Sequence, residues 1–209
     1  QKITRAFAGK MFAEHRAACA YAKDTAMRSV PEPFDVVLTT NSGYPLDQNL
    51  YQAVKGMSAA AKIVRDRGTI VCAAECRDGL PAHGSYGAVL KSQPNPRALL
   101  DMIKAPGRPT QPDQWQVQVQ AQVQLKASVQ VKTQGLSHEE VRAAHFMPID
   151  DVRPGMVGVG RTVFAGDALE EFRAHIVGVL RNVNGPRRDL ILARLEGGPL
   201  ANTGVISGM

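Results

Sequence analysis

Gln52 and Lys55 are the side chains whose types and spacing point most directly to chemistry. They lie three positions apart, and residues three apart on a helix share a face. A lysine ammonium supplies charge and a glutamine amide supplies directional hydrogen bonds, so together they can clamp a carboxylate or a phosphate. The same pair is also consistent with two solvated surface residues that bind nothing.

The segments around this pair predict how it is positioned. Residues 34–40 are an apolar run that predicts a buried strand, and residues 41–45 have the composition of a turn. Residues 46–65 are rich in alanine with apolar spacing near 3.6, which predicts a helix, and residues 69–74 predict a second strand. This order indicates an α/β fold with a parallel sheet, in which functional groups gather past the carboxyl ends of strands. A further helix is predicted over residues 11–28, ended by Pro31 and Pro33.

Residues 115–125 alternate strictly between apolar side chains and glutamine or another polar residue. Such alternation is the strand pattern, and periodicity alone therefore predicts a strand. The same stretch could be a helix between two apolar layers, because it then carries one apolar stripe led by Trp115 and an opposite one led by Val117.

Metal-ligand spacing is not found in the sequence. The three cysteines form no CxxC pair, and the spacing of Cys72 and Cys76 follows a buried strand, which predicts structural thiols rather than ligands. The five histidines form neither an HxxH nor an HExxH pattern. We therefore expect no metal site, no disulfide framework and a cytoplasmic, reducing setting.

The charge and hydropathy patterns limit the partners. The net charge is +6, and all of the excess lies in residues 1–146, which hold 18 Lys/Arg against 12 Asp/Glu. No run of five or more basic residues occurs and aromatics make up 5%, so nucleic-acid binding is not expected. No apolar run approaches the roughly 18 residues of a membrane span, and membrane insertion is not expected either.

Composition changes between about residues 140 and 150. Residues 147–209 contain neither lysine nor glutamine and are rich in glycine and valine. Their short β-branched runs, around residues 158–164, 175–180 and 190–195, predict strands of a small barrel or half-sandwich. We therefore predict a parallel-sheet α/β domain over residues 1–146, followed by a small incomplete β-rich segment over residues 147–209.

Several long motifs in the first part resemble the lactate racemase (LarA-like) family. They are Asp35-Val36-Val37, residues 43–56 (GYPLDQNLYQAVKG), residues 74–79 (AECRDG) and Asp113-Gln114-Trp115-Gln116. The resemblance covers about residues 10–146 and implies the carboxy-terminal α/β domain of a 2-hydroxyacid racemase. Such enzymes use a nickel-pincer nucleotide that is tethered to a lysine of the amino-terminal domain.

The resemblance also implies roles for particular residues. Gln52, Lys55 and Tyr51 would bind the substrate, a small 2-hydroxy acid anion, and Trp115 would wall the cleft beside the cofactor. No catalytic residue and no metal ligand is assigned in this chain. The family match further implies that residues 115–125 are helical, against the periodicity, and we adopt the helix.

Residues 147–209 resemble the start of the SpoIVB-type serine peptidase family. The likeness rests on residues 147–156, 160–164, 189–195, 197–200 and 203–209. In that family the nucleophile lies in a Ser-Gly-Ser-Pro stretch just after the Gly-Met pair, and Met209 is the last residue of this sequence. We therefore expect no peptidase activity, and Ser207 is interpreted as a turn residue.

These inferences lead to two hypotheses about function. The first is a substrate-binding fragment of a nickel-pincer-dependent 2-hydroxyacid racemase or epimerase. The absence of an initiator Met indicates a fragment. Such a fragment would be inactive and bind no cofactor by itself, because the amino-terminal domain that tethers the cofactor is missing. The alternative is a non-enzymatic protein-binding module, or a fusion with a truncated serine peptidase domain. Both hypotheses leave open which 2-hydroxy acid is bound.

Overall fold

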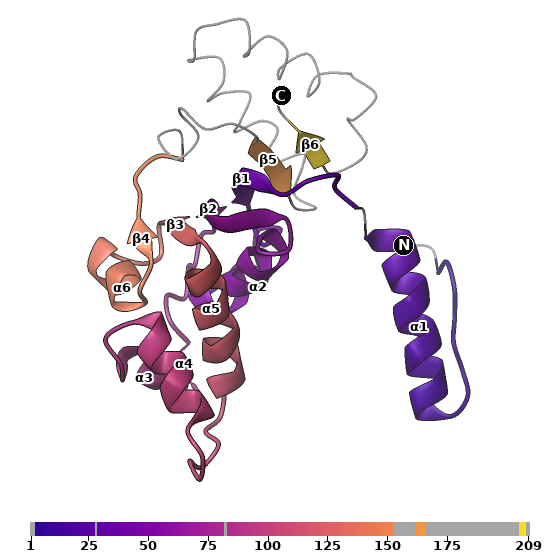
Figure 1. Cartoon of the computed structure of the whole chain (residues 1–209), viewed down its shortest axis with the longest axis horizontal. Helices are drawn as coiled ribbons and strands as arrows, with labels where there is room; N and C mark the ends of the chain where they lie inside the picture. Colours follow the sequence, from indigo (N-terminus) through magenta and orange to yellow (C-terminus); the bar gives the residue numbers. More distant parts are fainter. Residues whose placement is uncertain (1–2, 28, 82, 153–161, 166–204, 208–209) are drawn as a thin grey trace, which may run out of the picture. The chain divides into compact units, whose positions relative to one another are not determined.

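The computed structural model describes residues 3–27, 29–81, 83–152, 162–165 and 205–207. The chain divides into two compact units, Gln1–Glu32 and Pro33–Met209. Figure 1 traces the helices and strands of both units. They are α1 Met11–Ala26, β1 Phe34–Thr39, α2 Leu50–Ala60, β2 Val64–Ala73, α3 Tyr86–Lys91, α4 Pro96–Lys104, α5 Gln114–Lys126, β3 Ser128–Lys132, α6 His138–Ala143, β4 Met147–Pro148, β5 Thr162–Ala165 and β6 Val205–Ser207.

The first unit is helix α1 with the segment that precedes it. The predicted helix over residues 11–28 is confirmed, although none of its side chains is buried. Tyr21 packs against Phe7 with ring centroids 5.7 Å apart, and the Arg5 guanidinium lies over both rings. One aromatic pair and a cation therefore hold the preceding segment against α1.

The second unit contains a sheet with the strand order β4-β3-β2-β1-β5-β6. Strands β1 to β5 pair in parallel with their neighbours, and β6 pairs antiparallel with β5. Helices α2 and α5 contact each other and both contact β2, so they cover the same face of the sheet (Figure 1). The predicted α/β class with a parallel sheet is confirmed.

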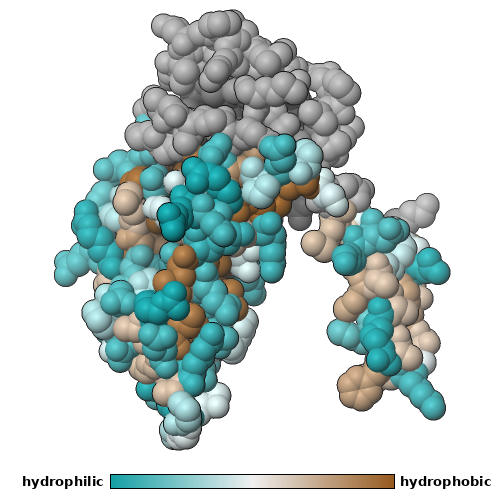
Figure 2. All heavy atoms as spheres, in the orientation of Figure 1, coloured by the Kyte–Doolittle hydropathy of each residue, from teal (hydrophilic) through white to brown (hydrophobic). Residues whose placement is uncertain are grey.

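The core lies between this sheet and its two covering helices. Val37, Ile70 and Val129 occupy neighbouring strands in register, and all three are buried. Ala53, Val54, Met57 and Ala60 of α2 face them at helical spacing. Figure 2 shows a largely hydrophilic surface on the drawn face of this unit, with a band of hydrophobic side chains over α5.

Helix α2 begins later and ends earlier than the sequence predicts. The Asn49 side chain accepts a hydrogen bond from the backbone N–H of Gln52. This cap makes the helix begin at Leu50 rather than near residue 46. In place of the predicted helical tail to residue 65, residues 61–63 form a turn and β2 begins at Val64. There Arg65 pairs with Asp35 of β1, so a contact distant in sequence overrides local helix propensity.

Helix α5 corrects the strand that periodicity predicts for residues 115–125. Gln116 and Gln120 are each 1% exposed, so a stripe of glutamines at a spacing of four is buried rather than solvated. Gln116 donates to the Tyr51 carbonyl at 2.7 Å, and Gln120 and Gln124 donate to the Ala144 carbonyl at 2.9 and 3.1 Å. Because these amides find partners, polarity here does not mean exposure.

The last part of the chain contributes strands to the same sheet. Met147–Pro148 pairs with β3, and Thr162–Ala165, within the stretch predicted as a strand near residues 158–164, pairs with β1. The strands predicted near residues 175–180 and 190–195 lie outside the described residues, and the boundary near residue 146 stays a prediction.

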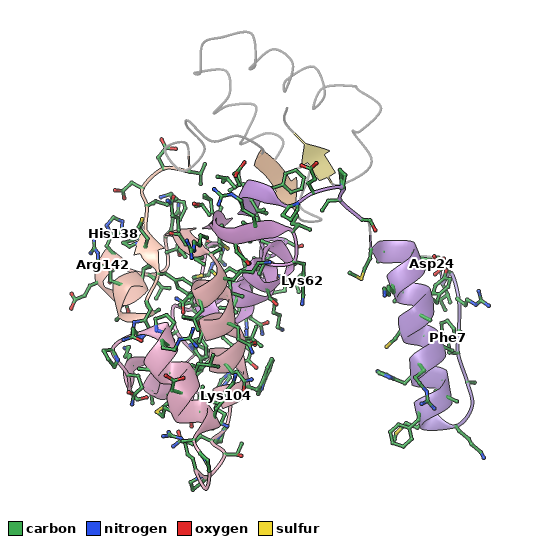
Figure 3. The ribbon with its side chains drawn as sticks, viewed as in Figure 1. Phe7, Asp24, Lys62, Lys104, His138 and Arg142 are labelled. Atoms are coloured by element: carbon green, nitrogen blue, oxygen red, sulfur yellow. The ribbon has the colours of Figure 1, made fainter. Side chains whose placement is uncertain are left out.

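Helix α6 presents His138 and Arg142 on its outer side (Figure 3).

Candidate functional site

The carboxyl ends of β1, β2 and β3 are joined by hydrogen bonds between the loops that follow them. Asp47, in the loop after β1, accepts from the Glu75 amide at 2.8 Å through its carboxylate and from the Cys76 amide at 3.1 Å through its carbonyl. Glu75, in the loop after β2, accepts from the Thr133 hydroxyl at 2.8 Å and the Gly135 amide at 2.9 Å. We call these three segments, residues 40–49, 74–80 and 133–136, the strand-end loops.

Close backbone packing supports the strand-end loops. A Cβ on Gly135 would lie 1.8 Å from the Cys76 carbonyl oxygen, and a Cβ on Gly56 would lie 2.2 Å from the Thr40 carbonyl oxygen. Only glycine fits at such distances, so the loop after β3 and helix α2 can approach their neighbours closely. The start of α2 is thereby fixed against the end of β1.

Helix α2 carries Tyr51, Gln52 and Lys55 in its first two turns. The Lys55 ammonium donates to the Gln52 side-chain oxygen at 2.5 Å, which confirms that the two share a helix face. Lys55 is exposed and Gln52 is half-buried. Because Lys55 carries a positive charge and takes up one lone pair of the Gln52 amide oxygen, most of the groups left on the pair are N–H donors, and such a pair favours a negatively charged ligand.

Tyr51 links this pair to Trp115 at the start of α5. Its ring meets the Trp115 ring edge-on, with centroids 5.9 Å apart and planes at 85°. The same ring also meets Tyr86, with centroids 5.3 Å apart and planes at 79°. Trp115 remains 54% exposed, so the predicted wall residue presents its indole to solvent beside Tyr51.

The Tyr51 phenol is protonated at neutral pH, and its surroundings raise its pKa further above the ordinary value of 10.0. Burial raises the pKa of Tyr51, and the negative charge of Asp113 raises it further. Asp113 precedes α5 and accepts a hydrogen bond from the Ser85 amide at 3.3 Å. A protonated phenol can donate a hydrogen bond, which adds a third donor type to the ammonium and the amide.

The structure brings the four predicted site residues into two contacting pairs, and both pairs include residues from the start of α2. Gln52 and Lys55 form one pair, and Tyr51 and Trp115 form the other. Sequence reasoning missed Tyr86, Gln116 and Gln120, which support these residues from behind. The only signal for the glutamines was their spacing of four within the alternating stretch.

The two buried cysteines are structural. Cys72 and Cys76 are each 0% exposed, which agrees with the prediction of buried thiols. Burial raises the pKa of Cys76 to about 11, although the Thr133 hydroxyl opposes part of this effect. Within the described residues, no group of three or more His, Cys, Asp or Glu side chains could hold a metal ion.

An α/β domain with donor groups at the carboxyl ends of its parallel strands is the class that this geometry defines. Residues 30–161 match the model of the lactate racemase C-terminal domain, and the chain belongs to that family. It is 38% identical over 152 residues to the lactate racemase of Thermoanaerobacterium thermosaccharolyticum and 44% identical over 121 residues to that of Lactiplantibacillus plantarum. These matches cover 72% and 57% of this chain.

A solved structure gives the same assignment. The lactate racemase apoprotein from Thermoanaerobacterium thermosaccharolyticum is 36% identical, with a TM-score of 0.66 over 73% of this chain and 36% of that chain. The chain spans about a third of the length of the curated relatives it matches, 35% of one and 28% of the other. No described helix has the length and apolar character needed to cross a membrane.

Proposed function

We propose that this domain binds a small 2-hydroxy acid anion as the substrate-contacting part of a racemase or epimerase. The observation that carries the proposal is the Lys55–Gln52 hydrogen bond of 2.5 Å on the first turns of α2, beside Tyr51 and Trp115. Family membership supports it, because the curated relatives are lactate racemases.

In this proposal the chain's own residues bind and orient the anion. The Lys55 ammonium would pair with the carboxylate, and the Gln52 amide would donate to a carboxylate or hydroxyl oxygen. Charge-assisted hydrogen bonds from two directions fix an anion's orientation, which a reaction at its hydroxyl-bearing carbon requires. The Tyr51 phenol and the Trp115 indole would limit the other directions in which the anion could tilt.

The family resemblance implies a nickel-pincer nucleotide, which would supply the redox chemistry at the substrate carbon when bound. The described residues do not fit a nickel site, because no group of three or more His, Cys, Asp or Glu side chains is close enough to hold a metal. We therefore assign the metal's ligands and tether to the part of the family enzymes that this match does not cover. The proposed role of this chain toward the cofactor is limited to Trp115, whose exposed indole would lie beside it.

The test is a calorimetric titration of the chain with D- and L-lactate, comparing wild type with Lys55→Ala and Gln52→Ala. Lys62→Ala is the matched control, because Lys62 is also exposed and lies just after the end of the same helix (Figure 3). We expect Lys55→Ala to weaken binding by about tenfold or more, which corresponds to roughly 1.4 kcal/mol, and Lys62→Ala to leave it unchanged.

Two outcomes would contradict the proposal. Equal losses in Lys55→Ala and Lys62→Ala would mean that lactate responds only to total charge. Absence of lactate binding, together with capture of a protein partner through residues 147–209, would favour the protein-binding module instead.

A further inference from the structure

Tyr86 lies directly behind the proposed wall of the site. It is 0% exposed, and its ring packs edge-on with the Tyr51 ring, which also packs edge-on with Trp115. Tyr51 therefore contacts both a fully buried ring and a half-exposed indole. Edge-to-face contacts of this kind depend on orientation, so a rotation of one ring is transmitted to the next.

The Tyr86 ring is itself anchored through its hydroxyl. The hydroxyl donates to the side-chain oxygen of Gln120, and the Gln120 amide nitrogen donates to the Ala144 carbonyl at 2.9 Å. Gln120 is 1% exposed, so these groups have no ready exchange with water. A buried polar chain whose members are all paired holds its side chains in one arrangement.

We propose that Tyr86 is a positioning residue: it sets the orientation of the Tyr51 ring and, through that ring, the orientation of Trp115. The consequence for a bound anion rests on the proposed function. The orientation itself does not, and it can be measured in the chain without any ligand. The contacts run from the Ala144 carbonyl to Gln120, from Gln120 to Tyr86, and from Tyr86 through Tyr51 to Trp115.

The sequence offers a direct reporter, because Trp115 is the chain's single tryptophan. Fluorine-labelled tryptophan incorporated into the full chain gives one fluorine NMR resonance that belongs to this residue alone. Acrylamide quenching of tryptophan fluorescence reports the exposure of the same indole. The variants are Tyr86→Leu, Tyr86→Phe and Tyr51→Leu, with Tyr21→Leu as control because Tyr21 stacks on Phe7 in the first unit.

We expect Tyr86→Leu to move the resonance toward its position in Tyr51→Leu. Acrylamide quenching should rise by less than about twofold, because Trp115 is already 54% exposed in the wild type. Tyr86→Phe keeps the ring but loses the Gln120 anchor, so a smaller shift in the same direction is expected. Tyr21→Leu should leave both readings at the wild-type value.

Circular dichroism identifies the variants that fold, and if Tyr86→Leu does not fold, Tyr86→Phe decides. Wild-type resonance and quenching in a folded Tyr86 variant would overturn the proposal, as would an equal shift in Tyr21→Leu. Adding lactate separates this inference from the proposed function. A wild-type resonance that ignores lactate, with Tyr86 variants shifted before lactate is added, contradicts the function and supports the positioning role. If lactate moves the wild-type resonance but the Tyr86 variants show no shift, the proposed function is supported and the positioning role is contradicted.

Discussion

At the scale of single residues, the hydrogen bond between Lys55 and Gln52 favours an anion as the proposed ligand. The Gln52 side-chain oxygen accepts from the Lys55 ammonium at 2.5 Å, so one of its two lone pairs is used. The pair then offers a positive charge and several N–H donors, which suit an anion better than a cation. If the Gln52 oxygen pointed to solvent instead of to Lys55, the pair would offer both an acceptor and donors and would favour an anion less strongly.

Replacing this amide by a carboxylate is the sharpest test at this scale. Gln52→Glu keeps the shape of the side chain and places a negative charge beside Lys55. The new carboxylate would neutralise the ammonium and repel an incoming anion, so lactate binding should weaken by about tenfold or more. Calorimetric titration measures the change, and a variant that binds lactate as tightly as wild type would show that the pair does not meet the anion.

At the scale of elements, α5 illustrates how partners decide secondary structure. Gln116, Gln120 and Gln124 each donate to a carbonyl that belongs to another segment. As a strand, the same stretch would place all six of its glutamines on one face. As a helix, it places some glutamines on a buried stripe, where they donate to carbonyls, and others, such as Gln122, on an exposed stripe.

This division predicts unequal effects of the same substitution along α5. Gln120→Leu removes the acceptor of the Tyr86 hydroxyl and one donor to the Ala144 carbonyl. We expect the free energy of unfolding to fall by about 1–3 kcal/mol, whereas Gln122→Leu on the exposed stripe should change it by less than about 0.5 kcal/mol. Urea unfolding measures both variants, and equal values would mean that the buried glutamines contribute no paired hydrogen bonds.

The contact between α2 and the end of β1 gives a second prediction at this scale. Gly56→Ala would place a Cβ 2.2 Å from the Thr40 carbonyl oxygen, and backbone must move to admit it. We expect a loss of about 2 kcal/mol or more in unfolding free energy. Gly87→Ala in α3 is the control, because its Cβ would meet only Leu80 at 3.7 Å; alanine there should be neutral or stabilising by up to about 1 kcal/mol.

At the scale of the whole molecule, one sheet combines distant parts of the sequence. Strands β4 and β5 lie beyond residue 146, yet they pair with β3 and β1, strands of the first part. The thiols and the phenol buried near the strand-end loops stay buried only while the second unit is folded, so their pKa values depend on its folding. Burial raises the pKa of Cys72, with smaller contributions from Cys76 and Asp47, and it raises the pKa of Tyr86 as well.

These raised pKa values predict a loss of stability in alkaline solution. The Cys76 pKa rises from its ordinary value of 9.0 to about 11, so between these values the unfolded thiol ionises while the folded thiol stays protonated. The unfolded state then binds fewer protons, and the free energy of unfolding falls as pH rises from about 9 to about 11. Urea unfolding across this range should show the fall, which Cys72→Ala should reduce.

The exposed Cys19 provides the control for this prediction. Cys19→Ala should lose stability with rising pH to the same extent as wild type. A wild-type stability that stays constant from pH 9 to 11 would contradict the assignment of Cys72 and Cys76 as buried, protonated thiols.

The sequence alone determined the features that depend on neighbours along the chain. The apolar runs placed β1 and the carboxy-terminal half of β2, and the alanine-rich segments placed α1 and α2, the latter with both ends too long. A spacing of three put Gln52 and Lys55 on one helix face. Each of these follows from the geometry of a helix or strand and needs no distant partner. Resemblance to a family added Tyr51 and Trp115, which no periodicity singled out.

The tertiary structure decided whatever depends on groups far apart in sequence. Helix α5 forms where alternation predicts a strand, because its glutamines meet carbonyls from Tyr51 and Ala144. Residues 64–68 join a strand rather than a helix, because the flanking residues Val64 and Thr69 pair with Phe34 and Val36 of β1. Which group a side chain contacts is decided only when the chain folds. The burial and the hydrogen bonds of the glutamines, and the orientation of Trp115, are therefore properties of the tertiary structure.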